Sequence, residues 1–241
     1  DLASVVWSTT VGAVAGPNLI TPGDAVGQIL GLPALSGVFL FAIAAQLLAV
    51  LLYAFALRPD PLRTALRLGV ERGAEKLADG PGDRSVVRTA IVSLALSHAT
   101  MAGVMAMTPV YLVDHGATLV IVGITISLHV AGMYGLSPLW GVLSDRLGRE
   151  AVIGVGQAML LAALLMTSFG AESPGWVLAG LIFLGLGWSA STVAASGLVT
   201  DSAAPARRTN VQGRADLSMS LAGAVVAGGS GVVLAAIGYA G

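Results

Sequence analysis

The 241-residue sequence contains no cysteine and few charged residues. Without cysteine the chain has no disulfide bond, no zinc-thiolate site and no thiol nucleophile. Charged residues make up 10% of the sequence, whereas a soluble domain carries about 25%. Hydrophobic residues make up 56%, and the mean hydropathy is +0.86. This composition excludes an ordinary soluble domain and indicates a membrane protein.

Glycine, in contrast, is abundant. The chain has 32 glycines among 241 residues, well above the usual share of about 7%. Small residues let the backbones of membrane helices approach closely. The glycine content therefore predicts tightly packed transmembrane helices.

Seven apolar windows are long enough to cross a bilayer, which takes about 20 residues. They are 2–20, 34–57, 89–113, 117–140, 151–169, 175–199 and 216–240. The windows are uniformly apolar and show no alternation with period two, so we expect helices rather than strands. The predicted fold class is an all-α polytopic membrane protein with seven transmembrane helices.

All twelve basic residues fall in the second, fourth and sixth loops between these windows. They are Arg58, Arg63, Arg67, Arg72, Lys76, Arg84 and Arg88, then Arg146 and Arg149, then Arg207, Arg208 and Arg214. The other loops carry only the acids Asp24, Asp114 and Glu172, together with His115. Because basic loops stay on the cytoplasmic side, we expect the even-numbered loops to be cytoplasmic and the chain to run from inside to outside.

The second loop is the only long one. Its middle, 62–77, has apolar residues at helical spacing among charges, which is typical of an interfacial helix on the inner leaflet. A solvated linker with partial helicity explains the same pattern equally well.

The fourth loop carries a dense motif, "GVLSDRLGRE". Its residues Gly141, Asp145, Arg146, Gly148 and Arg149 follow the spacing G-x-x-x-D-R-x-G-R. Glycine permits a tight turn, and Asp145 and Arg149 stand one helical turn apart. The motif resembles the signature that the major facilitator superfamily (MFS) carries in short cytoplasmic loops, where it would gate transport by latching two helix bundles.

A second motif lies in the first window, where "STTVGAVAGPNL" places Gly12, Gly16 and Pro17 in a ladder of small residues that ends in Gly-Pro. It resembles the fifth-helix motif of MFS antiporters, although the family's final glycine pair is replaced by Ile20 and Thr21. Ordinary helix packing explains a glycine ladder too.

Together the motifs imply helices five to eleven of a twelve-helix, two-bundle MFS fold, and hence a fragment of a longer protein. The resemblance assigns residues 1–57 to the last two helices of the N-terminal bundle. Residues 58–88 would be the cytoplasmic central linker, and residues 89–241 the first five helices of the C-terminal bundle. Eleven of the twelve basic residues are arginine, which points to a GC-rich bacterial source.

Ionisable groups at membrane depth usually have a function, but away from their ends the seven windows contain no Asp, Glu, Lys or Arg. His98 and His129 remain, and Thr125 shares a helix face with His129. These three are candidates for a cavity lining that binds substrate or protons; a neutral histidine bonded to a nearby Ser, Thr or carbonyl is the alternative. Gln157 is alone in its window and suits either helix contact or ligand binding.

The last loop is flanked by charges that suit either ion pairs at an inner gate or a solvated surface, namely Asp201, Arg207, Arg208, Arg214 and Asp216. Serines in "GWSAS" and "GLSP" lack the strand-turn-helix setting of a nucleophile, and there is no Walker or HExxH motif. An enzyme is therefore not expected.

We accordingly expect a secondary transporter in the plasma membrane that exports a small molecule by alternating access with proton exchange. Its partners would be a small-molecule substrate, the lipid bilayer and protons, with no nucleic acid, no cofactor and no metal, and the full-length protein would be a monomer. Two alternatives remain open: an MFS uptake carrier for a polar metabolite, and a membrane scaffold or sensor that transports nothing.

Overall fold

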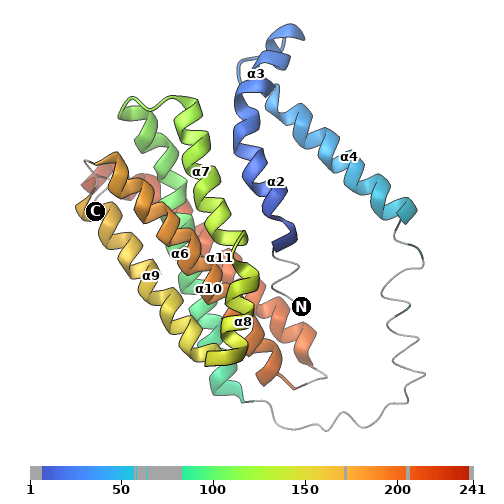
Figure 1. Ribbon diagram of the computed structural model, residues 1–241, viewed down its shortest axis with the longest axis vertical. Helices are drawn as coiled ribbons and strands as arrows, with labels where there is room; N and C mark the ends of the chain where they lie inside the picture. The colour runs from blue at the N-terminus through green and yellow to red at the C-terminus, as the bar shows by residue number, and fades with distance from the viewer. Residues whose placement is uncertain are drawn as a thin grey trace. The chain divides into compact units, whose positions relative to one another are not determined.

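The computed structural model describes residues 7–56, 58, 64, 83–170, 173–204 and 207–238. All regular elements in these ranges are helices (Figure 1). They are Thr10–Ala15 (α2), Ile20–Ile29 (α3), Val38–Ala56 (α4), Arg84–Asp114 (α6), Leu119–Tyr134 (α7), Ser137–Leu147 (α8), Arg149–Phe169 (α9), Pro174–Ser202 (α10) and Arg208–Ile237 (α11), with a 3-10 turn (η1) at Gly16–Leu19. The interfacial helix expected at 62–77 lies outside the described residues except for Thr64.

Six stretches of the described chain are long and apolar enough to cross a membrane. They are Val38–Ala56, Arg84–Asp114, Leu119–Leu147, Arg149–Phe169, Gly175–Ser202 and Arg208–Ala236. Each overlaps one of the last six predicted windows, which confirms the all-α membrane fold class.

Two of these helices begin earlier than hydropathy predicts. The helix expected from residue 89 begins at Arg84, because the Asp83 side chain caps it by accepting hydrogen bonds from the backbone N–H groups of Ser85 and Val86. The helix expected from residue 216 begins at Arg208. Hydropathy marks the membrane-embedded part of a helix, whereas capping decides where the helix itself starts.

The first window differs most from its prediction. Instead of one span over 2–20, the described part forms the short helix α2, the 3-10 turn η1 and then helix α3, which continues to Ile29. Pro17 lies within η1, and proline removes a backbone donor and disfavours the regular α-helix before it. Asp24, expected in a loop, consequently lies on α3.

Residue contacts divide the chain into two units. One comprises residues 19–80 and the other residues 1–18 with 81–241. In the first unit, α3 meets the start of α4 at glycines: a Cβ added to Gly23 would lie 2.7 Å from Cα of Val38. The Asp24 carboxylate accepts a hydrogen bond from the Leu35 backbone N–H at 2.8 Å and so closes the connection between α3 and α4.

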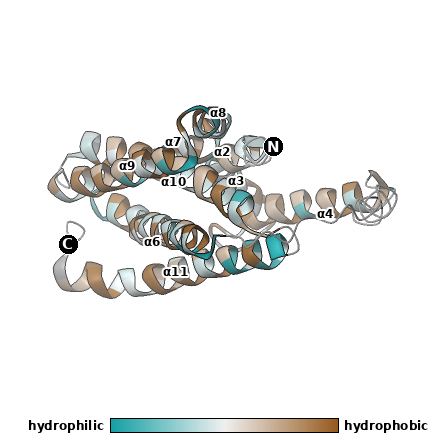
Figure 2. Cartoon of the chain, turned by 90° about the horizontal axis from the view of Figure 1, so that it is seen from below, coloured by the Kyte–Doolittle hydropathy of each residue, from teal (hydrophilic) through white to brown (hydrophobic). Residues whose placement is uncertain are grey.

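In the larger unit α10 is the central helix. Of its most apolar window, 67% is buried inside the protein, against at most 39% for any other candidate span. All three hydrophobic clusters contain α10 residues. Seen from below, α6 lies between α10 and α11 (Figure 2). Helix α10 therefore runs through the middle of the bundle and reaches Asp201 at its charged end.

Glycines make the close contacts of α10, as the composition predicted. A Cβ on Gly187 of α10 would lie 2.8 Å from the carbonyl oxygen of Gly156 on α9. On the opposite side, a Cβ on Gly132 of α7 would lie 3.2 Å from the carbonyl oxygen of Ile182. These distances are shorter than normal carbon contacts, so larger side chains there would push the helices apart.

Candidate gating site

The turn between α8 and α9 depends on Gly148. This residue has φ +92° and ψ 149°, a conformation that is open to glycine and strained for other residues. It ends α8 and directly precedes Arg149, the first residue of α9. Gly148 therefore forms the tight turn that the motif predicted.

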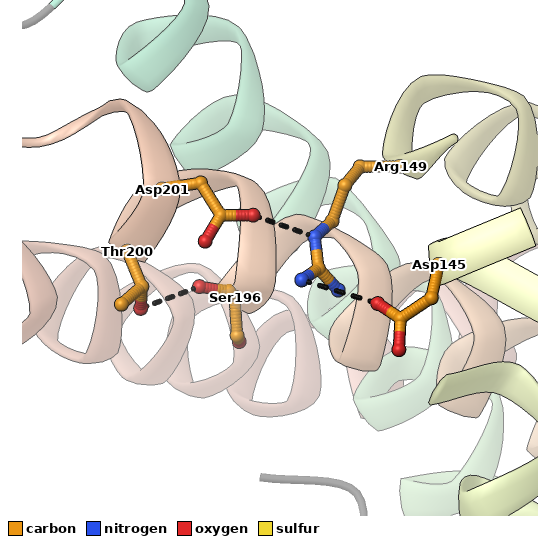
Figure 3. Close-up of polar contacts among 5 residues, drawn as sticks. All are labelled: Asp145, Arg149, Ser196, Thr200 and Asp201. Atoms are coloured by element: carbon orange, nitrogen blue, oxygen red, sulfur yellow. Dashed lines mark hydrogen bonds and ion pairs between the residues drawn. The ribbon is translucent and has the colours of Figure 1, made fainter. Parts of the chain in front are cut away.

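Arg149 lies between two carboxylates (Figure 3). Its Nε donates a hydrogen bond to Oδ2 of Asp201 at 2.8 Å, and its Nη2 is 3.5 Å from Oδ1 of Asp145. Asp145 lies on α8 and Asp201 on α10, so a single guanidinium connects the ends of three helices. The pairing of Asp145 and Arg149 crosses the Gly148 turn rather than one continuous helix.

The surface beneath Arg149 is flat because Gly197 of α10 has no side chain. A Cβ at Gly197 would lie 2.5 Å from Nη1, 2.6 Å from Cζ and 2.9 Å from Nε of Arg149. The guanidinium is therefore packed against the α10 backbone one helical turn before Asp201. Thr200 is also drawn in Figure 3, and its hydroxyl donates a hydrogen bond to the carbonyl oxygen of Ser196 at 3.0 Å.

Burial in this cluster is uneven. The Arg149 side chain is 27% exposed, whereas those of Asp145 and Asp201 are 66% and 57% exposed. Exposed ion pairs contribute only ~0.2–1 kcal/mol each. A link of this strength suits a contact that must break and re-form.

The other two motif residues have different surroundings. Gly141 is buried inside α8, and Arg146 is exposed in the last turn of that helix. Gly141 thus lies within the helix and outside the turn. The role of these five motif residues in gating stays a prediction.

The glycine ladder of the first window makes no close contact within the described part of the chain. A Cβ added to Gly12 or Gly16 would lie within 4 Å of no atom there. Contact with α7 comes from the residues between and after the glycines: Nδ2 of Asn18 donates to Oγ of Ser127 at 2.6 Å, and that hydroxyl donates to the Val14 carbonyl at 2.9 Å. Pro17 approaches α7 through its carbonyl, which lies 3.0 Å from a Cβ added at Gly123.

The two histidines have different partners. Nδ1 of His129 lies 2.7 Å from the backbone carbonyl oxygen of Leu181 on α10, and the residue is 1% exposed. His98 is half-buried, and its Nδ1 accepts a hydrogen bond from Nε1 of Trp188 at 3.2 Å. Thr125 is buried on α7 together with His129. A cavity role for these three residues stays a prediction.

Gln157 holds three helices together. From α9 its Nε2 donates to Oγ of Ser97 on α6 at 2.7 Å and lies 3.3 Å from Oγ of Ser191 on α10. The contacts fit the helix-packing interpretation of this glutamine. Asp201, which sequence reasoning considered for an inner gate, pairs with Arg149 rather than with the neighbouring arginines among the described residues.

Sequence reasoning missed Gly197 and Trp188. Gly197 is one of 32 glycines, and its sequence context does not distinguish it from the others. Trp188 stands in an apolar run, where a core residue is the ordinary interpretation. Only the three-dimensional neighbours Arg149 and His98 set these two residues apart.

Comparison with known proteins gives a consistent result. The family model for the Major Facilitator Superfamily matches residues 2–228. Two Bacillus subtilis proteins, named as uncharacterized MFS-type transporters YddS and YdeG, are 35% and 36% identical; each alignment covers 96% of this chain and 55% of the relative. The riboflavin transporter RfnT of Brucella anthropi is 34% identical over 51% of this chain and 31% of its own length.

No solved structure gives a significant match. The chain spans about half the length of YddS and YdeG, 55% in each case. The family model covers nearly all of the chain, and the helices are apolar and long enough to span a membrane. The chain therefore belongs to the major facilitator superfamily.

Proposed function

We propose that the chain is part of a secondary transporter that exports a small molecule by alternating access, with proton exchange as the driving force. MFS proteins are multi-pass membrane transporters and not enzymes, and the finer assignment rests on the Arg149 cluster. Secondary transporters of this kind move one helix bundle against the other around a central site. A gate for such motion needs a reversible contact at a bundle end.

The Arg149 cluster meets that requirement. One partly buried guanidinium binds carboxylates from two other helices. Its contacts are weak enough to break in each cycle, and they break together when Arg149 moves. This is the observation that carries the proposal, since helix packing alone requires no charge at this turn.

The membrane topology and the bundle assignment are part of the proposal. All twelve basic residues lie in the even-numbered loops or at the helix ends beside them. This supports a position of the Arg149 cluster on the cytoplasmic side of the membrane, which we take to be the plasma membrane. We assign residues 1–57 to the N-terminal bundle, 58–88 to the central linker and 89–241 to the C-terminal bundle. The glycine ladder at Gly12 and Gly16 supports export.

Transport by the full-length protein in inverted vesicles tests the proposal. A panel of labelled compounds is offered with and without a proton gradient, and pH-dependent flux of at least one compound is expected. The variant Asp145→Ala should insert normally and lose flux, because Arg149 then keeps only one carboxylate. Normal flux in this variant would reduce the motif to a signal for topology.

Uptake of a polar metabolite is the second candidate. The 34% identity to a protein named as a riboflavin transporter supports a polar metabolite as the substrate, over about half of this chain. Flux into right-side-out vesicles that is independent of the proton gradient would favour uptake. No flux in either direction would favour a scaffold or sensor.

A further inference from the structure

We propose that His98 is the group that binds the transported proton, and that Trp188 couples its charge to the packing of α6 against α10. This inference rests on the proposed proton exchange and goes further by choosing one of the candidate residues and naming its partner. It is carried by the hydrogen bond from Nε1 of Trp188 to Nδ1 of His98.

The direction of this hydrogen bond requires that Nδ1 of His98 carry no proton. An indole N–H only donates, so Nδ1 of His98 must present a lone pair. A neutral imidazole with its proton on Nε2 satisfies this requirement, whereas a protonated imidazole carries N–H groups on both nitrogens. Uptake of a proton from water onto the Nδ1 lone pair thus removes the acceptor, and the N–H groups of His98 and Trp188 then face each other.

Trp188 connects more than one helix. Its ring lies 5.9 Å from that of Tyr134 on α7 in an edge-to-face arrangement, and it belongs to the hydrophobic cluster that contains Met133 of α7 and Leu160 of α9. Rotation of the indole away from a protonated His98 would therefore disturb the contacts of α10 with both α6 and α7.

The other edge of the His98 ring faces α11. A Cβ at Gly223 would lie 2.5 Å from Cδ2 and 3.0 Å from Nε2 of His98, so the ring is held between α10 and α11. The His98 ring therefore has little room to move toward α11. The repulsion between the N–H groups of a protonated His98 and Trp188 is then relieved by movement of the indole on α10.

Few other ionisable groups lie near His98. Along the apolar parts of the helices packed around it, the described titratable side chains are Tyr111 on α6 and His129 and Tyr134 on α7; α9, α10 and α11 contribute none there. The nearest charged residue along α11 is Asp216, seven residues before Gly223, which is roughly 10 Å along a helix axis. No neighbouring carboxylate on these helices competes for the proton.

His129 is the less suitable candidate. Its Nδ1 donates to the Leu181 carbonyl, so an added proton would go to Nε2, and this atom is buried with no hydrogen-bond partner among the described residues. A buried N–H without an acceptor costs at least about 1–3 kcal/mol. His129 therefore serves to hold α7 against α10.

The link between the two proposals is α10 itself. Trp188 lies near its middle and Asp201 near its end, 13 residues apart or roughly 20 Å along a helix. A change in how α10 packs at Trp188 acts on the same helix whose end is bound by Arg149. Proton binding at His98 would thus act on the Arg149 cluster through α10.

Tryptophan fluorescence of the full-length protein in detergent tests this without any substrate. A protonated imidazole quenches a neighbouring indole, so the emission of Trp188 reports the charge of His98. The Trp188 emission is isolated by subtracting the spectrum of Trp188→Phe from that of the parent protein. It should lose intensity as the pH falls through the histidine range, about pH 8 to 5.

Two variants separate protonation from general structural effects. His98→Asn places an amide oxygen near the position of Nδ1, so it accepts the indole N–H but does not titrate; its Trp188 emission should be high and independent of pH. His129→Gln is the matched control and should keep the parent titration. The inference is overturned by a Trp188 emission that ignores pH, or by one that still titrates in His98→Asn.

Flux measurements then distinguish failure of this inference from failure of the proposed function. If Trp188 titrates through His98 but transport is independent of the proton gradient, proton exchange fails while the hydrogen-bond switch stands. If transport depends on the gradient in His98→Asn as in the parent, the proton binds elsewhere and this inference is wrong.

Discussion

Replacement of Gly197 by alanine should impair transport by displacing Arg149. The new methyl carbon would lie 2.5–2.9 Å from three guanidinium atoms, whereas such atoms normally stay about 3.5 Å or more apart. The guanidinium must therefore move by about 1 Å. The alanine itself suits a helix, so the effect should come from Arg149.

The size of the effect follows from the hydrogen bond that is lost. A shift of this size lengthens the contact between Nε and Oδ2 of Asp201 from 2.8 Å to a value outside the usual hydrogen-bond range, which ends at about 3.2 Å. Because the pair is partly exposed, the loss is about 1 kcal/mol, the upper end for exposed ion pairs. An equilibrium constant changes about fivefold for that energy. The ratio of closed to open gate should therefore fall about fivefold.

The assay is the initial rate of transport by the full-length protein, measured for Gly197→Ala, Asp201→Ala and the double variant. Asp201→Ala removes the acceptor of the Arg149 hydrogen bond. If Gly197 acts through this contact, the double variant should resemble Asp201→Ala alone, because the two changes remove one interaction. Gly154→Ala on α9 is the matched control, since a Cβ there would meet no atom of the described residues within 4 Å. Additive losses, or parent flux in Gly197→Ala, would refute the reasoning.

Two further predictions concern stability. Gly148→Ala should lower the free energy of unfolding by roughly 1–3 kcal/mol, because alanine is strained at the observed φ of +92°; a thermal midpoint equal to that of the Gly154→Ala control would contradict the role of the turn. Gln157→Leu should remove the hydrogen bond to Ser97, which costs on the order of 0.6–1.7 kcal/mol in a membrane protein, while flux stays near that of the parent. A large loss of flux at unchanged stability would instead identify Gln157 as a ligand contact.

Hydropathy predicted the spans well because a helix in a bilayer must be apolar over its whole embedded length. Six windows are confirmed for this reason. The single helix predicted for the first window was wrong in detail. Pro17 marks where a regular helix is interrupted, but a proline does not tell whether the chain then leaves the membrane or continues as a new helix. Here helix α3 follows immediately.

The contacts of the candidate sites were much harder to predict. Arg149 and Asp201 are 52 residues apart, and so are His129 and Leu181. The partner of His129 is a backbone carbonyl, which every residue has, so no residue type could reveal it. The motif identified Asp145 and Arg149 because they are near in sequence, whereas the packing of α9 against α10 adds Asp201 and Gly197.

The charge at the α8–α9 turn has two explanations that the structure helps to separate. Topology alone asks for basic residues on one side of the membrane, and a solvated arginine would satisfy it, as the exposed Arg146 does. Arg149 differs, because it is 27% exposed, bound to two carboxylates and seated on a glycine. The positive-inside bias depends on Lys and Arg, so it requires neither the two acids nor Gly197. Their presence around one arginine is better explained by a contact that transport must make and break.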